Sequence, residues 1–169
     1  RYRGGRERAR ALEAPWRGRG RPDRGGETMS VAIDERLAEL GRRLAAREEQ
    51  QAPALEAAWD RARSLHGRVA QALDHYHGAV LPGAPQLAVV LTDPRVDDKH
   101  LHAVEFELAR GRHRAVVTVK SRGEVTLVGP FRAGKTEGPC RSFPFDADAE
   151  IESAMGDFLC AFIEEAVAP

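Results

Sequence analysis

Between Leu87 and Val128 the chain alternates β-type segments with turn residues, and this alternation constrains the fold more than any other feature. The first segment is continuously apolar, which is typical of a central strand buried on both faces. The later segments mix apolar and polar side chains in alternation and are separated by tight turns at Gly111 and Gly123. Turns this short join antiparallel neighbours, so the pattern predicts a four-stranded meander. The predicted strands are residues 87–91, 102–108, 114–120 and 125–128.

Helical patterns precede the predicted sheet. Apolar residues recur at helical spacing in the first pattern, where Asp34 is placed to cap the helix or to lie in its first turn. Pro53 then suits either the first turn of a new helix or a kink. A second, wider apolar pattern continues to Gly78, which is placed to end the helix. The first pattern consists of Ile33, Leu37, Leu40 and Leu44.

The C-terminal segment predicts an amphipathic helix with acidic residues on its polar side and Asp148 near its N-terminus. Cys160 lies near the apolar face and is expected in the core. Just before this helix, Phe143 and Phe145 indicate a short fifth strand that Pro144 confines to an edge of the sheet. The apolar face consists of Ile151, Met155, Phe158, Leu159, Phe162 and Ile163.

These elements together predict an α+β fold. It comprises an N-terminal helix or kinked helix pair, a four- to five-stranded antiparallel meander sheet and a C-terminal amphipathic helix. The chain of 169 residues is long enough to bury a core, and residues 29–169 are expected to form a single domain.

Charge is unevenly distributed along a chain whose formal net charge is zero. Residues 1–28 carry nine arginines against four acidic residues and show no apolar periodicity, so we expect this segment to be disordered. One interpretation is an Arg/Gly arm that binds RNA. The other, which we favour, is a leader ahead of a natural start at Met29, where codons for Gly26-Glu27-Thr28 would resemble a bacterial ribosome-binding site. Nucleic-acid binding is therefore expected only if the arm is native.

Residues 129–136 match the phosphate-loop pattern G-x-x-x-x-G-K-[ST], but their context argues against a nucleotide site. A functional loop leads directly into a helix whose N-terminus holds the phosphates. Here Gly138 and Pro139 follow, which break a helix at its first turn, and Pro130 lacks one of the N–H donors. We interpret the match as a false P-loop, a turn between two strands.

Basic residues gather at the predicted 110–114 turn and in the loop 129–142. If both segments lie at the same end of the sheet, they would form a positive pocket for a small anionic ligand or a nucleotide. The alternative is scattered surface charge on exposed turns. The candidate anion-binding residues are Arg110, Arg112, Arg114, Arg132, Lys135 and Arg141.

The histidines and cysteines give only weak signals. On a strand, His100 and His102 would point to the same face, with Asp97 upstream, as a zinc site requires. Their spacing matches no known zinc motif, so polar residues at the start of a strand are the favoured interpretation. Cys140 beside Arg141 suggests a reactive thiol, but no general base marks it. We predict no catalytic residue, no metal and no cofactor, although a site assembled from distant loops would leave no local signature.

The apolar stripe of the second helical pattern, between residues 55 and 80, is wide enough to serve two purposes. It is either the helix face that packs on the sheet or a surface that meets a second copy in a twofold dimer. The candidate interaction residues are Leu55, Trp59, Ala62, Leu65, Val69 and Tyr76.

These observations predict a small cytoplasmic, non-catalytic interaction module of the adaptor, chaperone or regulatory kind, working as a dimer or with a protein partner. No apolar run approaches the length of a membrane span, so no membrane partner is expected. The alternative hypothesis is a protein that binds a small anionic ligand or a nucleotide through the basic turn and the loop 129–142.

Overall fold

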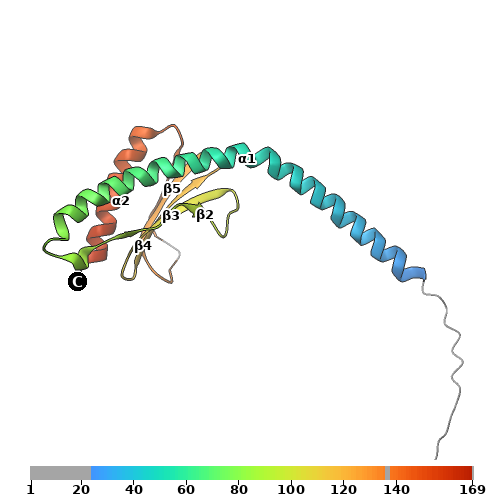
Figure 1. Cartoon of the computed structure of the whole chain (residues 1–169), viewed down its shortest axis with the longest axis horizontal. Coiled ribbons are helices and arrows are strands. Elements are labelled where there is room, and N and C mark those ends of the chain that lie inside the picture. Colours follow the sequence, from blue (N-terminus) through green and yellow to red (C-terminus); the bar gives the residue numbers. More distant parts are fainter. Residues whose placement is uncertain (1–23, 136–137, 169) are drawn as a thin grey trace, which may run out of the picture. The chain divides into compact units, whose positions relative to one another are not determined.

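The computed structural model describes residues 24–135 and 138–168, with side chains from Ala32 onward. It has a long N-terminal helix, an antiparallel sheet and a C-terminal helix (Figure 1), which confirms the predicted α+β fold. The helices are α1 (Arg24–Val80) and α2 (Asp148–Val167), with a short 3-10 turn, η1 (Pro85–Leu87). The strands are β1 (Val90–Leu91), β2 (Arg95–Val96), β3 (Ala103–Arg110), β4 (His113–Lys120), β5 (Glu124–Arg132) and β6 (Cys140–Pro144).

The chain divides into two compact units, one reaching to Leu44 and the other starting at Ala45. The described part of the first unit is helical throughout. Asp34, predicted to cap this helix or to lie in its first turn, lies in the helix interior because α1 already begins at Arg24. Residues 1–23 of the N-terminal segment, which was interpreted either as a leader or as an RNA-binding arm, lie outside the described residues. The leader residues from Arg24 to Thr28 belong to α1.

α1 is one helix that runs through Pro53, so the prediction of one N-terminal helix is confirmed and Pro53 does not begin a new helix. Proline lacks the N–H that would donate to the carbonyl of Glu49, four residues earlier. The segment 52–58 around the proline is rich in alanine, the residue with the highest helix propensity, which offsets part of this loss. The helix continues past Gly78 and ends at Val80.

The strands form one antiparallel sheet in the order β1-β3-β4-β5-β6, with β2 also paired to β3. β3 and β4 pair along their whole length, from Ala103 opposite Lys120 to Arg110 opposite His113. β6 pairs with β5 at the far edge, which confirms the predicted edge strand around Pro144. In the described residues the sheet has six strands, where four to five were predicted.

The segment 87–91 was predicted as a central strand, and this prediction was wrong. Only Val90 and Leu91 are strand residues; they pair with β3 at the edge of the sheet, and Val90 is 60% exposed. The preceding backbone is instead held by α1. The Tyr76 hydroxyl donates to the Leu87 carbonyl at 2.9 Å, and the Val89 N–H donates to a ring nitrogen of His77 at 3.1 Å. Side chains of a distant helix thus replace the expected strand neighbour.

β2 was not predicted. It pairs with β3 as β1 does, so the two short strands form one edge that is interrupted at 92–94. Pro94 has no N–H for a ladder hydrogen bond, which accounts for the break. Thr92 bridges it, because its backbone N–H donates to the Glu107 carbonyl and its hydroxyl accepts from the Glu107 N–H, both at 2.9 Å.

Alternation along the central strands separates an apolar face of the sheet from a polar one. Phe106 of β3 is 1% exposed, whereas its neighbours Glu105 and Glu107 point to the other face and are half-buried. Buried residues of α1 and α2 join the core cluster with the apolar face. We call the opposite, polar face the open face. The core residues from the helices are Ala58, Ala62, Leu65, Val69, Leu73, Ile151, Ala154, Met155, Phe158, Leu159, Phe162 and Ala166.

Gly129 occupies a position in β5 where only glycine fits. Its φ is +119°, and an added Cβ would lie 3.0 Å from the Cα of Ala115 and 3.1 Å from the carbonyl oxygen of Arg114. We expect Gly129→Ala to lower the free energy of unfolding by about 2 kcal/mol or more, because it adds both backbone strain and a clash with a neighbouring strand. Urea unfolding measures this loss. The matched control is Gly134→Ala, where φ is +93° but nothing lies within 4 Å. Equal losses in both variants would show that the clash contributes nothing.

Candidate functional site

The segment that matches the phosphate-loop pattern lies within the sheet. Residues 129–132 belong to β5, and the next described element is the strand β6. Thr136 lies outside the described residues. Two backbone donors of the segment are used inside the fold: the Gly129 N–H donates to Pro139 at 2.8 Å and the Ala133 N–H donates to Arg112 at 2.6 Å. In its described residues the segment is therefore the end of a strand followed by a turn, as expected for a false P-loop.

The tip of the β3–β4 hairpin and the β5–β6 loop lie at the same end of the sheet. His113 is the register partner of Arg132, and the hydrogen bond from Ala133 to the Arg112 carbonyl joins the two segments directly. In the following turn the Lys135 N–H donates to the Arg132 carbonyl at 2.9 Å. Three of the predicted anion-binding side chains are exposed here, and we call them the basic end. They are Arg112, Arg132 and Lys135.

Arg110 is used by the fold. Its guanidinium donates to the carbonyl of Ala166 at the end of α2 and to the carbonyl of Gln86 at 2.9 Å. α2 has no basic residue in its own last turn, so Arg110 supplies the positive charge that a helix C-terminus favours. This side chain therefore ties β3 to the end of α2.

The other two predicted anion-binding residues also contact neighbouring side chains. The Nε of Arg114 lies 2.8 Å from a carboxylate oxygen of Glu107, and its guanidinium also donates to backbone carbonyls of the hairpin. The Arg141 guanidinium lies 5.3 Å from the ring centroid of Phe143, within cation–π range. Three of the six predicted residues thus lie at the basic end, Arg110 and Arg114 bind other groups of the chain, and Arg141 is exposed but lies against Phe143.

His100 and His102 do not come together with a third ligand. His100 lies 2.8 Å from Asp97, and His102 lies 3.4 Å from Glu48 on α1. Within residues 24–135 and 138–168, no three His, Cys, Asp or Glu side chains are arranged to hold a metal ion.

A hollow of about 540 Å³ lies between the 97–102 turn and the open face. Its polar lining includes the Asp97–His100 pair and Lys120, which lies 2.5 Å from Glu124. Burial works to raise the pKa of Asp97, but hydrogen bonds from the Lys99 backbone and from His100 outweigh it, and the pKa is lowered overall. The charged groups of the hollow are therefore largely paired with one another.

Glu124 is the centre of a polar cluster on the open face. Its carboxylate accepts hydrogen bonds from Lys120 at 2.5 Å, from Arg122 at 2.9 Å and from the Thr126 hydroxyl at 3.1 Å. The hydrogen bond from Lys120 is the main cause that lowers the pKa of Glu124 to about 2; burial opposes it, and Arg122 and Thr126 add to the lowering. The cluster stabilises the β4–β5 hairpin, because Lys120, Arg122 and Thr126 all bind the same carboxylate.

The six predicted interaction residues of the second helical pattern lie in the core or against it. Ala62, Leu65 and Val69 are buried in the core cluster. The other three are half-buried and pack against that cluster; they are Leu55, Trp59 and Tyr76. The sequence left two uses for this stripe open, packing on the sheet and contact with a second copy. In the structure the stripe packs in the chain's own core.

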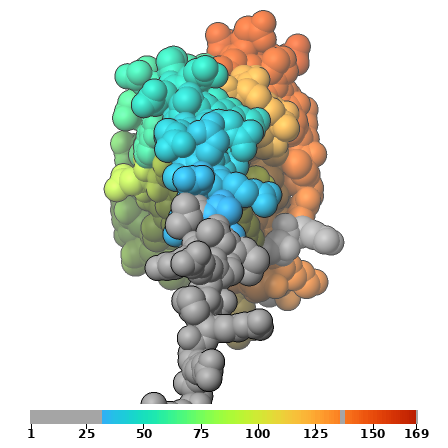
Figure 2. Space-filling model, turned by 90° about the vertical axis from the view of Figure 1, so that its right-hand side faces the viewer, coloured from blue at the N-terminus to red at the C-terminus, as the bar shows by residue number. Residues whose placement is uncertain are grey.

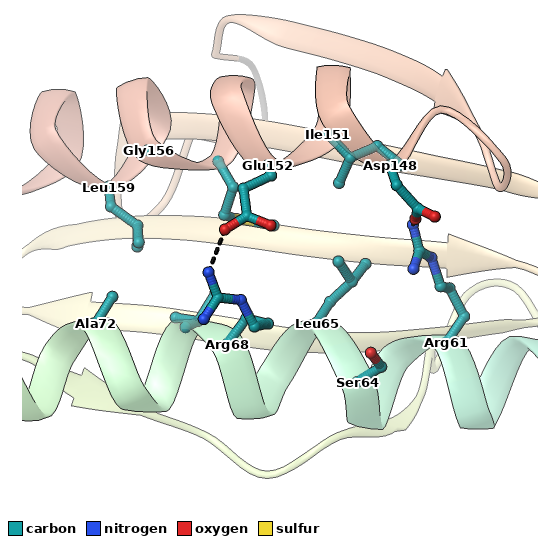
Figure 3. A pocket seen from close by; sticks show the side chains of 12 residues that line it. Arg61, Ser64, Leu65, Arg68, Ala72, Asp148, Ile151, Glu152, Gly156 and Leu159 are labelled. Carbon is teal, nitrogen blue, oxygen red and sulfur yellow. Dashed lines mark hydrogen bonds and ion pairs between the residues drawn. The ribbon is translucent and has the colours of Figure 1, made fainter.

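A groove of about 290 Å³ runs between α1 and α2 (Figure 3). Leu65 and Ile151 line it from the two helices. Ion pairs link the helices across the groove, so its rims are already joined by the chain's own side chains. The pairs are Arg61–Asp148, at 2.5 Å, and Arg68–Glu152.

Both cysteines are exposed thiols. The prediction that Cys160 lies in the core was wrong. It is two positions from both Phe158 and Phe162, which places it about 200° around the helix from these buried rings. Cys140 begins the edge strand β6, and no ring nitrogen, carboxylate or amine is hydrogen-bonded to it in the described part of the chain.

The first unit carries a different feature, an apolar surface formed by Ile33, Leu37, Leu40 and Leu44. These side chains are 52%, 61%, 41% and 50% exposed. We call these four residues the apolar seam. The part of the helix that bears them is drawn in blue in Figure 2. The sequence predicted the helix but not that this face would be exposed; the 4-3-4 spacing of the four residues is the signal that points to a helix–helix contact.

No family model, curated protein or solved structure matches this chain. None of the helices in the described residues has both the length and the hydrophobicity needed to cross a bilayer.

The Glu124 cluster predicts how stability depends on pH. Because the pKa of Glu124 is lowered to about 2 in the folded chain, from 4.5, its contribution is fully present above about pH 5 and is lost as the pH falls toward 2. Glu124→Gln should therefore lower the free energy of unfolding at neutral pH, and its difference from the wild type should shrink on acidification. Urea unfolding at several pH values measures this. Glu164→Gln removes an exposed α2 carboxylate without an ion pair among the described residues and is the control. A constant difference between Glu124→Gln and the wild type would contradict the assignment.

Proposed function

We propose that this chain is a small, cytoplasmic, non-catalytic protein-interaction module that self-associates through the apolar seam. The observation that carries this proposal is the exposure of four large aliphatic side chains on one face of a helix. Single exposed apolar residues are ordinary on protein surfaces, whereas a contiguous row at helical spacing is typical of an interaction surface.

The size of the seam sets the expected strength of association. Full burial of one aliphatic side chain is worth about 1.5–3 kcal/mol, so pairing two seams yields several times that before the costs of association are subtracted. The seam covers only Ile33 to Leu44, because Arg47 and Gln51 occupy the next two positions of the pattern. We therefore expect a reversible dimer with a dissociation constant in the micromolar range.

The other surfaces fit a non-catalytic role. The hollow beside the open face contains charges that are paired with one another, and the segment that resembles a phosphate loop is part of the sheet. Two exposed free thiols are compatible with a reducing compartment, which supports the cytoplasmic assignment.

Charge introduced into the seam should abolish self-association. In the variant with Leu37→Glu and Leu40→Glu, two carboxylates would have to be buried without partners in each copy, which costs more than the contact provides. Sedimentation equilibrium of the full chain from about 1 to about 200 µM should show wild-type dimers and monomeric variant, given the expected micromolar affinity. Leu101→Glu, at a side chain that is 70% exposed outside the seam, is the matched control and should still dimerise. A wild-type chain that stays at 18.6 kDa throughout would refute the proposal.

Anion binding at the basic end is a second candidate function. It is favoured by the hydrogen bond between Ala133 and Arg112, which brings two cationic loops to one end of the sheet. Their exposed side chains can attract a phosphate group without first breaking an ion pair among the described residues.

Charge reversal distinguishes the two candidate functions. The variant with Arg132→Glu and Lys135→Glu should lose binding of inorganic phosphate or of a nucleoside triphosphate, because the basic end changes sign. Its dimerisation should be unchanged, because the seam is not altered. Isothermal titration calorimetry with each anion, at low and at physiological salt, measures the binding. No heat from the wild-type chain with either anion would remove this candidate.

A further inference from the structure

We infer that the partner of the apolar seam is a second copy of this chain, aligned parallel and in register. This inference rests on the proposed self-association and adds the orientation of the two helices. The spacing of the seam sets the frame: Leu37 and Leu44 occupy a positions of a heptad, and Ile33 and Leu40 occupy d positions.

Burial of the seam does not decide the orientation. In a parallel pair each seam residue faces its own counterpart. In an antiparallel pair Ile33 faces Leu44 of the second copy, and Leu37 faces Leu40 of the second copy. Both arrangements bury the same eight side chains, so the decision falls to the residues beside the seam.

The residues beside the seam are segregated by charge. One flank, the g positions, carries Arg36 and Arg43. The other flank, the e positions, carries Asp34, Gly41 and Glu48. The side chains on both flanks are exposed, so they are available at the edges of a helix pair.

A parallel pair places each g residue against the following e residue of its partner. Arg43 then lies opposite Glu48 of the second copy, and the symmetry of the pair makes this contact twice. Arg36 lies opposite Gly41, which has no side chain and no charge. Glu48 is 59% exposed, and its distance of 3.4 Å from His102 is too long for a strong hydrogen bond, so its carboxylate can accept from Arg43.

An antiparallel pair places g residues against g residues and e residues against e residues. In this pair Leu37 lies opposite Leu40 of the second copy. Arg36, one residue before Leu37, therefore faces Arg43, three residues after Leu40, and the symmetry of the pair makes this contact twice. The parallel pair thus has two attractive Arg43–Glu48 contacts, whereas the antiparallel pair has two repulsive Arg36–Arg43 contacts. The difference favours the parallel pair by about tenfold in the dissociation constant at low salt.

Disulfide trapping tests the orientation directly. In a full chain with Cys140→Ser and Cys160→Ser, Ile33→Cys is made in one preparation, and Leu44→Cys is made in a second that carries a mass tag. In a parallel pair each variant cross-links to itself. In an antiparallel pair the two copies of residue 33 lie about 16 Å apart, beyond reach of a disulfide, so only the mixed product forms. Leu101→Cys, outside the seam, gives the background of random collisions.

A charge exchange tests the contact that sets the orientation. Arg43→Glu should weaken the dimer about tenfold by placing like charges opposite each other, and adding Glu48→Arg to the same chain should restore it. Circular dichroism verifies that each variant keeps its helix. Self-linked products at both positions, with rescue by the exchange, support the inference. Mixed products only, or a missing rescue, overturn the parallel pair while the proposed self-association stands. Wild-type chains that remain monomeric overturn both.

Discussion

The structure depends on the packing of one face of the sheet against two helices. Alternation along β3, β4 and β5 sends Val104, Phe106 and Leu108, together with their cross-strand neighbours, to the same side of the sheet. A single helix is too narrow to cover this surface, so it is shared between α1 and α2, and the core cluster contains residues from both. The apolar stripe of the second helical pattern is wide because this part of α1 packs both on the sheet and beside α2.

Once one face is committed to the helices, the side chains of the other face must remain compatible with water. The open face accordingly carries cross-strand ion pairs, in which Arg95 meets Glu105 and Arg114 meets Glu107. Such pairs on a half-exposed surface are worth little individually. They satisfy the polar groups without producing the strained or isolated charges that are typical of active sites.

The sequence predicted those elements whose signal is local, and it failed where a distant contact decides. Gly111 and Gly123 mark turns through their own conformational freedom, and the strands beside them were predicted to within a few residues. The segment before β1 is apolar and resembles a strand, yet hydrogen bonds from Tyr76 and to His77 hold it against α1. In the sequence Arg110 resembles an anion-binding residue, but in the structure its guanidinium donates to a carbonyl at the end of α2. No periodicity in a single chain records such pairings.

The apolar seam is a second case in which the sequence pattern alone does not determine the contact. Periodicity specifies that a helix has an apolar face, but it does not specify what covers that face. The stripe of Ala62, Leu65 and Val69 and the seam of Leu37, Leu40 and Leu44 are similar as patterns, yet the first is buried and the second is exposed. A helix with an uncovered apolar face gains nothing from packing, and isolated helices are only marginally stable in water even with good helix formers. The first unit also contains Gly41 in its helix, at a further cost of about 1 kcal/mol relative to alanine. A partner that covers the seam would supply the packing energy that this part of α1 otherwise lacks, so helix formation in the first unit and association through the seam should be coupled.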